Sequence, residues 1–285
     1  MKKIVKVGLS GGLGNQLFQF ALGISTSIAN DCYLYFFWNQ RKSIHNTPRK
    51  FALKFLGINL GKLYKIEICS YALSIKKIKY KFVHVRKSYK YYEQHFHFTE
   101  IPKTVVEHSS IKYIGYWQSS KYFTEYSSIL KQYILKNLPS SMTFTENKAA
   151  LHIRLGDFVS SKYASENHGI ISKEYLELSL NLLAQDQIKK IDIYTDSVHI
   201  ATELLGSLNS TFDFNFVSTN NTIIDLGNMV NYSHFIGSNS SFSWWAAFLG
   251  SDNRKIIMPK KWFSGELALR NNTKDLYENK WLVIN

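Results

Sequence analysis

The sequence predicts an α/β protein made of two Rossmann-like domains that face a cleft. First, its 285 residues are enough for two domains of ordinary size. Second, short apolar runs of strand length alternate with stretches of helical periodicity. Third, this alternation occurs both before and after the segment Leu138-Pro139-Ser140-Ser141, which ends a helical pattern. We therefore expect one domain over residues 1–140 and a second over residues 141–285.

In the first domain, the strand–helix–strand order is clearest near the N-terminus. Lys3–Leu9 predicts a strand, and Asn15–Asn30 predicts a helix with one apolar face. Cys32–Trp38 predicts a second strand that is apolar almost throughout, as expected for a parallel strand covered on both faces. Residues 40–110 are less regular and rich in aromatic residues, and Tyr122–Asn137 predicts an amphipathic helix.

In the second domain, strands and helices alternate without a break, which predicts βαβ units around a parallel sheet. The expected strands are Ala149–Arg154, Ile191–Thr195, Phe214–Val217, His234–Gly237 and Lys255–Met258. The expected helical segments are Ser172–Ala184, Ser197–Leu205, Asp225–Asn231 and Ser241–Gly250. Ser172 is the expected N-cap of the first of these helices, with the acidic Glu174 in its first turn.

The composition indicates a protein of a reducing cytoplasm. Hydrophobic residues make up 45% of the chain, yet no apolar run approaches the roughly 18 residues of a membrane span. The charged start of the sequence lacks the apolar stretch of a signal peptide. Two cysteines, Cys32 and Cys69, are too few for a disulfide scaffold and lack the spacing of metal ligands.

The formal net charge of +14, from 35 Lys and Arg against 21 Asp and Glu, allows three interpretations. A nucleic acid, an anionic membrane surface and a diphosphate substrate would each attract such a surface. Most of the excess lies in residues 40–140, where each basic run also fits a simple solvated face. The charge alone does not choose between these interpretations.

A glycine-rich turn, Gly11-Gly12-Leu13-Gly14-Asn15-Gln16, connects the first expected strand to the first expected helix. Glycines allow the backbone to approach a ligand closely, and a helix N-terminus offers unpaired N–H groups. The third glycine of a dinucleotide fingerprint and the Gly-Lys-Ser/Thr of a P-loop are both missing. The turn alone fits a structural role equally well.

The segment His152-Ile153-Arg154-Leu155-Gly156-Asp157 runs off the end of an expected strand. Strand alternation places His152 and Arg154 on the same face, and Asp157 follows a glycine into the loop. An Arg at this position suits bidentate binding of a diphosphate. The structural alternative is an ion pair between Arg154 and Asp157.

Two further polar segments follow expected strands. In Tyr194-Thr195-Asp196-Ser197, the acidic residue suits either a base or ribose contact or a plain N-cap. In the run from Ser238 to Ala247, four hydroxyls and one amide surround an expected helix start, where N–H groups and the helix dipole favour an anion. The adjacent Trp244 and Trp245 cannot share one helix face, so we expect at least one in the core or lining the cleft.

Taken together, these segments resemble the glycosyltransferase family that contains the bacterial α-1,2-fucosyltransferases, glycosyltransferase family 11. The glycine turn resembles the family's N-terminal signature, and His152–Asp157 resembles its H-x-R-x-G-D motif. Asn239–Trp245 resembles its N-S-S/T-F-S-W-W motif, and Pro259–Phe263 the segment that follows. The order and the spacing also match. One departure is Leu155, which stands where the family usually has a second Arg.

The resemblance implies a GT-B fold and an inverting transfer of L-fucose from GDP-β-L-fucose to the 2-hydroxyl of a galactose-type acceptor. It also implies a place in the synthesis of a surface polysaccharide of the O-antigen type. The charge that grows on the departing GDP needs a metal or fixed donors. No two Asp residues stand two positions apart, so the D-x-D metal motif is absent. We therefore expect a metal-independent enzyme without a cofactor.

The expected catalytic residues are Arg154, which would hold the diphosphate, and Asp157, which would act as the general base. Asp196 and Asp225 are the candidates for guanine or ribose recognition. The expected GDP-fucose-binding residues are Gly14, Asn15, Gln16, His152, Arg154, Asp196, Asp225, Asn239, Ser240, Ser241, Phe242 and Ser243. The second domain would bind GDP-fucose, and the first would lie on the acceptor side.

The expected partners are GDP-fucose and a galactose-terminated oligosaccharide or lipid-linked glycan, without nucleic acid. A lipid-linked acceptor would bring the cytoplasmic protein into peripheral contact with the inner face of the membrane. The main alternative, which Leu155 leaves open, is a catalytically silent protein that binds sugar nucleotides or glycans on the same fold. A nicotinamide oxidoreductase and a basic nucleic-acid-binding module are weaker alternatives.

Overall fold

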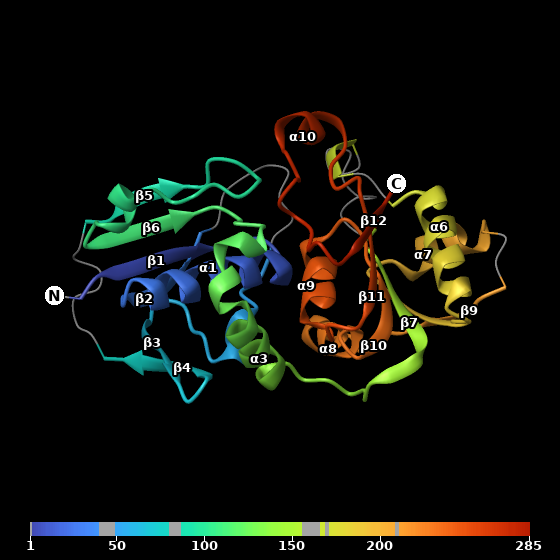
Figure 1. Cartoon of the computed structure of the whole chain (residues 1–285), viewed down its shortest axis with the longest axis horizontal. Helices are drawn as coiled ribbons and strands as arrows, with labels where there is room; N and C mark the ends of the chain where they lie inside the picture. The colour runs from blue at the N-terminus through green and yellow to red at the C-terminus, as the bar shows by residue number, and fades with distance from the viewer. Residues whose placement is uncertain (1, 40–48, 80–86, 156–165, 169–170, 209–210) are drawn as a thin grey trace. The chain divides into compact units, whose positions relative to one another are not determined.

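The computed structural model describes residues 2–39, 49–79, 87–155, 166–168, 171–208 and 211–285. The chain divides into two compact units (Figure 1). Unit 1 comprises Met1–Asn137 and Asn272–Leu276, and unit 2 comprises Leu138–Asn271 and Tyr277–Asn285. The sequence places the change of domain at residue 140, and it does not indicate that a short segment near the C-terminus groups with unit 1.

Unit 1 is built on a six-stranded sheet in the order β4-β3-β2-β1-β6-β5. Its strands are β1 (Ile4–Leu9), β2 (Tyr33–Trp38), β3 (Leu63–Cys69), β4 (Ala72–Ile78), β5 (Tyr89–Tyr92) and β6 (Ser110–Ile114). Its helices and 3-10 turns are α1 (Leu13–Ala29), η1 (Leu53–Leu56), α2 (Lys103–Val106), η3 (Ser120–Tyr122), η4 (Thr124–Tyr126) and α3 (Ser127–Asn137). β1, β2, β5 and β6 are parallel, whereas β3 and β4 form an antiparallel hairpin beside β2.

Two parts of unit 1 differ from the sequence prediction. The stretch 40–110 contains the β3–β4 hairpin and β5, whose half-exposed faces mix lysines with apolar residues and hide the strand pattern. The helix predicted from Tyr122 begins at Ser127. Phe123 interrupts it, because this residue adopts φ −142° and packs its buried ring 6.4 Å from that of Phe18.

Unit 2 has a fully parallel six-stranded sheet in the order β12-β11-β10-β7-β8-β9. Its strands are β7 (Thr145–Ile153), β8 (Lys190–Thr195), β9 (Asp213–Phe216), β10 (Tyr232–Ile236), β11 (Lys255–Pro259) and β12 (Leu282–Ile284). Its helices are α6 (Lys173–Gln185), α7 (Val198–Gly206), α8 (Thr222–Met229), α9 (Ser241–Leu249) and α10 (Gly265–Arg270). With β7 as the first strand of the unit, this is the 3-2-1-4-5-6 order of dinucleotide-binding folds.

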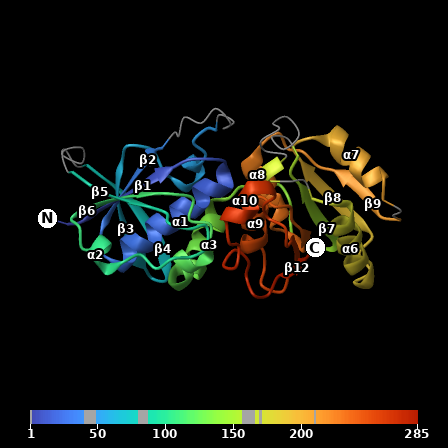
Figure 2. The same cartoon turned by 90° about the horizontal axis from the view of Figure 1, so that it is seen from above.

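The helices of unit 2 cover both faces of its sheet (Figures 1 and 2). α6 and α7 lie on one face, where side chains such as Leu176 and Leu205 pack against Leu151 and Ile153 of β7. α8 and α9 lie on the other face. The predicted N-cap of α6 is confirmed, since the Ser172 hydroxyl accepts a hydrogen bond from the Tyr175 N–H at 3.1 Å.

The two adjacent tryptophans of α9 are both fully buried. Trp244 and Trp245 have no exposed surface, and their ring centroids lie 5.2 Å apart in an edge-on arrangement. Trp244 also contacts the ring of Trp281 at 5.4 Å. Both tryptophans therefore serve the core of unit 2, beneath the polar N-terminus of the same helix.

Each unit is Rossmann-like, which confirms the two-domain α/β organisation of the GT-B fold. That the units face a cleft stays a prediction. None of the helices in the described part of the chain combines the length and the apolar character that crossing a bilayer requires.

Arg254, which precedes β11, is buried between the C-terminal ends of α8 and α9. Its Nη2 donates to the Met229 carbonyl at 2.6 Å and its Nη1 to the Ala246 carbonyl at 2.9 Å. The guanidinium also lies 4.7 Å from the centre of the Phe235 ring. Burial lowers the pKa of Arg254 to about 9, so the group stays charged at neutral pH. The negative ends of two helix dipoles offset the cost of burying this charge.

We predict that Arg254→Met lowers the free energy of unfolding by about 3 kcal/mol, because two buried carbonyls lose a charged donor. Urea denaturation of the purified variant would measure this loss. Arg270→Met is the matched control, since Arg270 is exposed and bonded only to Glu266 on its own helix among the described residues. Its effect should stay within about 0.5 kcal/mol. Equal effects of the two substitutions would contradict the prediction.

Candidate active site

The candidate active site of unit 2 lies where β7 and β10 end side by side. The two strands are parallel neighbours, with Leu151 opposite Ile236. The chain leaves β7 toward β8 on one side and leaves β10 toward β11 on the other. Such a reversal of strand order opens a crevice beyond the carboxyl ends of the strands, where ligands bind in α/β sheets.

A buried hydrogen-bond cluster joins the ends of these two strands. His152, the penultimate residue of β7, has its Nδ1 2.6 Å from the Ser243 hydroxyl of α9 and 3.2 Å from the Ser238 hydroxyl. The Ser238 N–H donates to the Ser243 Oγ at 3.1 Å. The Ser243 hydroxyl can donate its proton to His152 Nδ1. In that arrangement the neutral imidazole would carry its proton on Nε2.

Burial is the main reason why His152 is neutral. The residue is 6% exposed, and its desolvation lowers the pKa of His152 to about 4, with a further contribution from the positive charge of Arg154. The ring of Phe242 lies 5.2 Å away and covers one side of the imidazole. His152 thus holds the end of β7 against the start of α9 without adding charge to the site.

The N-terminus of α9 points a set of amide groups at the same place. Ser240 is the N-cap, and its hydroxyl accepts from the Phe242 N–H at 3.2 Å. The first-turn amides of a helix lack intrahelical acceptors, and the helix dipole adds partial positive charge there. Ser241 and Phe242 are partly exposed, whereas Ser243 is buried. This end of α9 is therefore suited to bind an anion.

Asn239 anchors the loop between β10 and α9. It is 6% exposed, and its Nδ2 donates to the His168 carbonyl at 2.6 Å and to the Trp262 carbonyl at 3.2 Å. The side chain therefore connects this loop to two other segments of unit 2. Asn239, one of the residues expected to bind GDP-fucose, thus holds the backbone beside the N-terminus of α9.

Arg154 lies just beyond β7 and is paired with Asp196, which follows β8. Arg154 Nη1 is 2.7 Å from Asp196 Oδ2, and both side chains are partly exposed. Asp196 Oδ1 also accepts from the Leu155 N–H at 2.8 Å. The carboxylate therefore fixes both the guanidinium and the backbone beside it. The ion pair with Asp157 that the sequence allows lies outside the described residues, whereas the pairing with Asp196 lies within them.

Leu155 is fully buried in the core between the sheet and α6. Strand alternation turns residues 154 and 155 to opposite sides, so the side chain at 155 lies on the face away from Arg154. In this chain, the departure from the usual second Arg therefore leaves the face of His152 and Arg154 intact.

Asp225 lies in the first turn of α8. Its Oδ1 accepts from the Thr219 hydroxyl at 2.8 Å and from the Thr219 N–H at 3.2 Å. These bonds shape the turn between β9 and α8, while Asn221 caps the helix. Both Asp196 and Asp225, expected to recognise guanine or ribose, already hold protein groups in this structure.

The glycine turn with Gly14, Asn15 and Gln16 belongs to unit 1. Gln16 is fully buried, and its Nε2 donates to the carbonyls of Gly11 and Lys50, each at 2.9 Å. Its Oε1 accepts from the Ala52 N–H at 2.9 Å. The prediction that Gln16 contacts GDP-fucose does not fit this geometry, because the side chain is used to hold the segment after β2. Gly14 is also buried, within α1.

One residue near Arg154 carries no signal in the sequence. His168 is partly buried, and desolvation followed by the charge of Arg154 lowers its pKa. Its ring lies 5.8 Å from that of Phe263. No motif spacing points to His168, which is separated from Arg154 by residues 155–167 in the sequence.

Asp157, the expected general base, lies outside the described residues. Among the residues that are described, no three His, Cys, Asp or Glu side chains group as metal ligands would.

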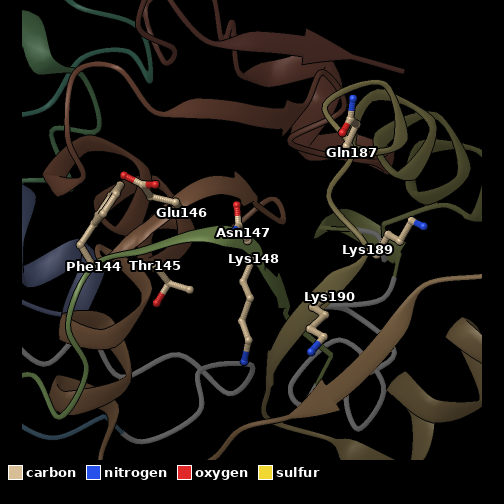
Figure 3. Close-up of a pocket in the computed structure, with 8 residues that line it drawn as sticks. All are labelled: Phe144, Thr145, Glu146, Asn147, Lys148, Gln187, Lys189 and Lys190. Atoms are coloured by element: carbon tan, nitrogen blue, oxygen red, sulfur yellow. The ribbon is translucent and has the colours of Figure 1, made fainter.

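A shallow hollow of about 640 Å³ lies at the other end of β7 and β8 (Figure 3). It is lined by Phe144, Thr145, Glu146, Asn147, Lys148, Gln187, Lys189 and Lys190. Lys148 and Lys190 are paired across the two strands and point to the same side (Figure 3). Since this hollow is at the amino ends of the strands, the rule for parallel sheets places the ligand at the opposite edge.

Solved structures of similar fold include POFUT1 in complex with GDP-fucose, with 14% identity and a TM-score of 0.48, covering 90% of this chain and 97% of that one. FUT1 of Arabidopsis thaliana in complex with GDP shows 12% identity and a TM-score of 0.46, covering 90% of this chain and 70% of that one.

Two Escherichia coli proteins are similar in sequence. An α-1,2-colitosyltransferase is 29% identical over 293 residues, which covers 99% of each chain. The O-antigen biosynthesis glycosyltransferase WbnK is 30% identical over 138 residues, which covers 48% of this chain and 44% of that protein. The model of glycosyl transferase family 11 matches residues 4–285, almost the full length. With its two Rossmann-like units and its motifs at the end of β7 and the start of α9, this chain belongs to glycosyl transferase family 11.

Proposed function

We propose that this protein is an inverting fucosyltransferase that moves L-fucose from GDP-β-L-fucose to the 2-hydroxyl of a galactose-type acceptor in O-antigen-like polysaccharide synthesis. The observation that carries the proposal is the contact of His152 with Ser243, which joins the end of β7, just before Arg154, to the N-terminus of α9 at the switch point of unit 2. Membership of the family supports glycosyl transfer, the name of the colitosyltransferase supports an α-1,2 linkage, and the name of WbnK supports an O-antigen-type glycan as the product.

The chemistry of the site suits a departing nucleoside diphosphate. Negative charge grows on the diphosphate as the glycosidic bond breaks, and fixed donors at that position lower the barrier. A guanidinium has five N–H donors, so Arg154 can bind phosphate oxygens while Asp196 fixes its orientation. The amides at the start of α9 and the hydroxyls of Ser240 and Ser241 would complete the binding of the anion.

A neutral His152 fits the same role. Its Nε2–H would be one further donor on the face of Arg154, and its lack of charge avoids repulsion of the guanidinium. A protonated His152 would have to be buried beside that cation, which its low pKa of about 4 opposes. Ser243 and Ser238 therefore act as positioning residues, which keep the imidazole in one orientation.

The donor sugar has a second candidate, which the full-length similarity to an α-1,2-colitosyltransferase favours. Colitose is L-fucose without its 3-hydroxyl, so both sugars would arrive on GDP and leave by the same chemistry. A site that hydrogen-bonds the 3-hydroxyl would prefer fucose strongly, whereas an apolar site would accept both. Direct comparison of the two donors distinguishes these cases.

The other parts of the proposal rest on the sequence. Asp157 is the proposed general base, and the absence of a D-x-D motif supports transfer without a metal. Unit 2 is the proposed donor domain and unit 1 the proposed acceptor domain. A lipid-linked glycan at the inner face of the cytoplasmic membrane is the proposed acceptor, and the net charge of +14 supports peripheral contact with anionic lipids.

The position of Leu155 argues against the catalytically silent alternative. Because this side chain is part of the core, its presence does not remove a cation from the side of Arg154. Arg154 is also paired with a carboxylate, and His152 is uncharged. The site therefore keeps the groups that would bind an anion.

The proposal predicts turnover when the purified protein is incubated with GDP-fucose and a galactose-terminated oligosaccharide in the presence of EDTA. GDP release and a new α-1,2-linked fucoside, undiminished by the chelator, are the expected results. GDP-colitose is tested in parallel, and a higher kcat/KM for it would assign the donor to colitose. Mass spectrometry of the glycan and coupled detection of GDP provide the measurement.

Asp157→Asn is the inactive control for this assay, since it should bind GDP-fucose and fail to transfer. Binding of GDP-fucose by the natural sequence without any turnover would instead support the silent alternative. Thermal stabilisation by NAD but not by GDP would favour an oxidoreductase. Activity that EDTA abolishes would refute metal-independent transfer.

We predict that Arg154→Ala lowers kcat/KM on the order of a hundredfold while the protein stays folded, because a fixed donor to the leaving diphosphate is lost. The kcat/KM of Arg154→Lys should lie between those of Arg154→Ala and the natural enzyme, since lysine keeps the charge but lacks the planar fork of the guanidinium. Asp196→Asn keeps an acceptor for the Leu155 N–H and should cost less than Arg154→Ala. A kcat/KM within threefold of the natural enzyme for Arg154→Ala would eliminate the diphosphate assignment.

The buried His152 predicts a specific dependence of stability on pH. Its folded-state pKa, about 4, lies below the ordinary value of 6.5. Between these values the unfolded chain takes up a proton that the folded protein does not, so this stability is present above pH 6.5 and is lost as the pH falls toward 4. The full loss would be on the order of 3 kcal/mol.

His152→Asn offers the test, because the amide can still accept from Ser243 but does not titrate. Urea unfolding from pH 7 to pH 4.5 should show a smaller decline for this variant than for the natural protein. His199→Asn is the control, since the His199 side chain is 83% exposed. Parallel stability curves for His152→Asn and the natural protein would show that His152 is not the titrating group.

A further inference from the structure

Unit 1 has a switch point of its own, between β1 and β6. β1 pairs with β2 on one side and with β6 on the other, both in parallel, so the strand order reverses at β1. The carboxyl ends of β1 and β6 lead into the segments 10–12 and 115–119. The rule that places ligands at such a reversal applies to this sheet as it does to that of unit 2.

The segment after β6 is held in a strained conformation. Trp117 has a φ of +60°, which is rare for a bulky side chain, and the residue is 1% exposed. Glu93 accepts the N–H groups of Tyr116 and Trp117 at 2.7 and 2.8 Å. The indole is enclosed by neighbouring rings, among them Tyr122, whose centroid lies 5.3 Å away in an edge-on contact. Strained backbone of this kind persists where its surroundings enforce it, and it concentrates at ligand sites.

The strained turn brings the Gln118 side chain against the start of α1. Gln118 Nε2 donates to Asn15 Oδ1 at 2.7 Å, and Gln118 is 8% exposed. The flanking residues are fixed as well, because Gln19 donates to the Gly115 carbonyl at 2.8 Å and Ser119 donates to the Asp275 carbonyl at 2.8 Å. The amide pair therefore has a rigid support on both sides.

Glycine at position 11 is a requirement of this arrangement. Its φ of +74° favours glycine, and a Cβ there would lie 2.4 Å from Asn15 Nδ2. Gly11 thus leaves the space that the Asn15 amide occupies.

The amide pair retains hydrogen-bonding capacity. Within the described residues, the bond between them is the only one that the side chains of Asn15 and Gln118 make. Whichever way the two amides are oriented, the pair leaves one NH₂ group and one carbonyl oxygen for a ligand. Both groups are neutral, and they belong to side chains in direct contact.

Such a pair matches hydroxyl groups better than a phosphate. A hydroxyl both donates and accepts, so two adjacent hydroxyls of a sugar can bind the NH₂ and the carbonyl oxygen together. A diphosphate only accepts, and its oxygens would meet the amide carbonyl with repulsion. Both sites lie at a helix N-terminus, but unit 2 adds the cation of Arg154, whereas the amide pair of unit 1 adds no charge.

We propose that the β1–β6 switch point of unit 1 is the acceptor site, where Gln118 and Asn15 bind neighbouring hydroxyls of a neutral sugar. The strained turn at Trp117 holds Gln118 in place for this purpose. The inference rests on the proposed glycosyl transfer for the biological identity of the sugar, but binding itself can be tested without turnover. It moves Asn15 from the donor, where the sequence places it, to the acceptor.

The test is a titration of the whole protein with methyl glycosides of galactose, glucose, N-acetylgalactosamine and N-acetylglucosamine, and separately with GDP. The indole N–H signal of Trp117, assigned with Trp117→Phe, reports on the strained turn by NMR. We expect at least one glycoside to shift this signal in a saturable manner. Gln118→Leu should lower the affinity for that glycoside roughly tenfold or more and leave the affinity for GDP unchanged.

Gln132→Leu, on the exposed side of α3, is the matched control and should change neither affinity. Asn15→Ala is the second variant, because it suits a helix and should reproduce the loss if Gln118→Leu fails to fold. No shift by any of the glycosides, or an unchanged glycoside affinity in both variants, would overturn the proposal. A loss of GDP affinity in Gln118→Leu would also overturn it, by assigning the site to the donor.

The two proposals fail in different ways in this experiment. A natural protein that binds a glycoside at Trp117 but does not bind GDP would contradict the donor assignment and keep the sugar site. A protein that binds GDP but no glycoside would keep the donor assignment and remove the sugar site.

Discussion

Both units depend on one constraint, which is the parallel pairing of the first strand of each sheet with a strand that comes later in the chain. β1 pairs with β6, and β7 pairs with β10. Because parallel strands end at the same edge, these pairings bring together loops that are far apart in sequence. The cluster of His152, Ser238 and Ser243 and the pair of Asn15 and Gln118 are direct results.

A helix starts at each of the two edges, α1 in unit 1 and α9 in unit 2, and the edges differ in the side chains beside these helix starts. In unit 2, α9 starts at the site and ends at Arg254, so its positive end is available to an anion while its negative end is already matched by a buried cation. The hydrogen bonds of Asp196 keep Arg154 directed along the same edge. In unit 1, neutral amides take the corresponding place, which gives the proposed donor and acceptor sites distinct chemistry on similar folds.

Much of unit 2 could be predicted from the sequence, because buried parallel strands produce continuous apolar runs and Ser172 and Ser240 are ordinary helix caps. The edge hairpin of unit 1 was hidden by its mixed, half-exposed faces. Motif positions predicted which loops meet, but not which atoms bond. The ion pair of Arg154 with Asp196 was not expected, and the Gln16 side chain supports the segment after β2. Such outcomes depend on distances between strands, which periodicity does not encode, and the same holds for the Glu93–Trp117 turn.

The segment Asn272–Leu276 belongs to unit 1 although it is synthesised after nearly all of unit 2. During translation, chains emerge from the N-terminus and domains tend to fold in that order. Here two contacts of unit 1 form late, because Ser119 and Lys121 receive their partner Asp275 only when this residue has left the ribosome. The turn that carries Gln118 is therefore completed late, after the sequence of unit 2 is available, so a truncated nascent chain would lack the Asp275 contact beside the proposed sugar site.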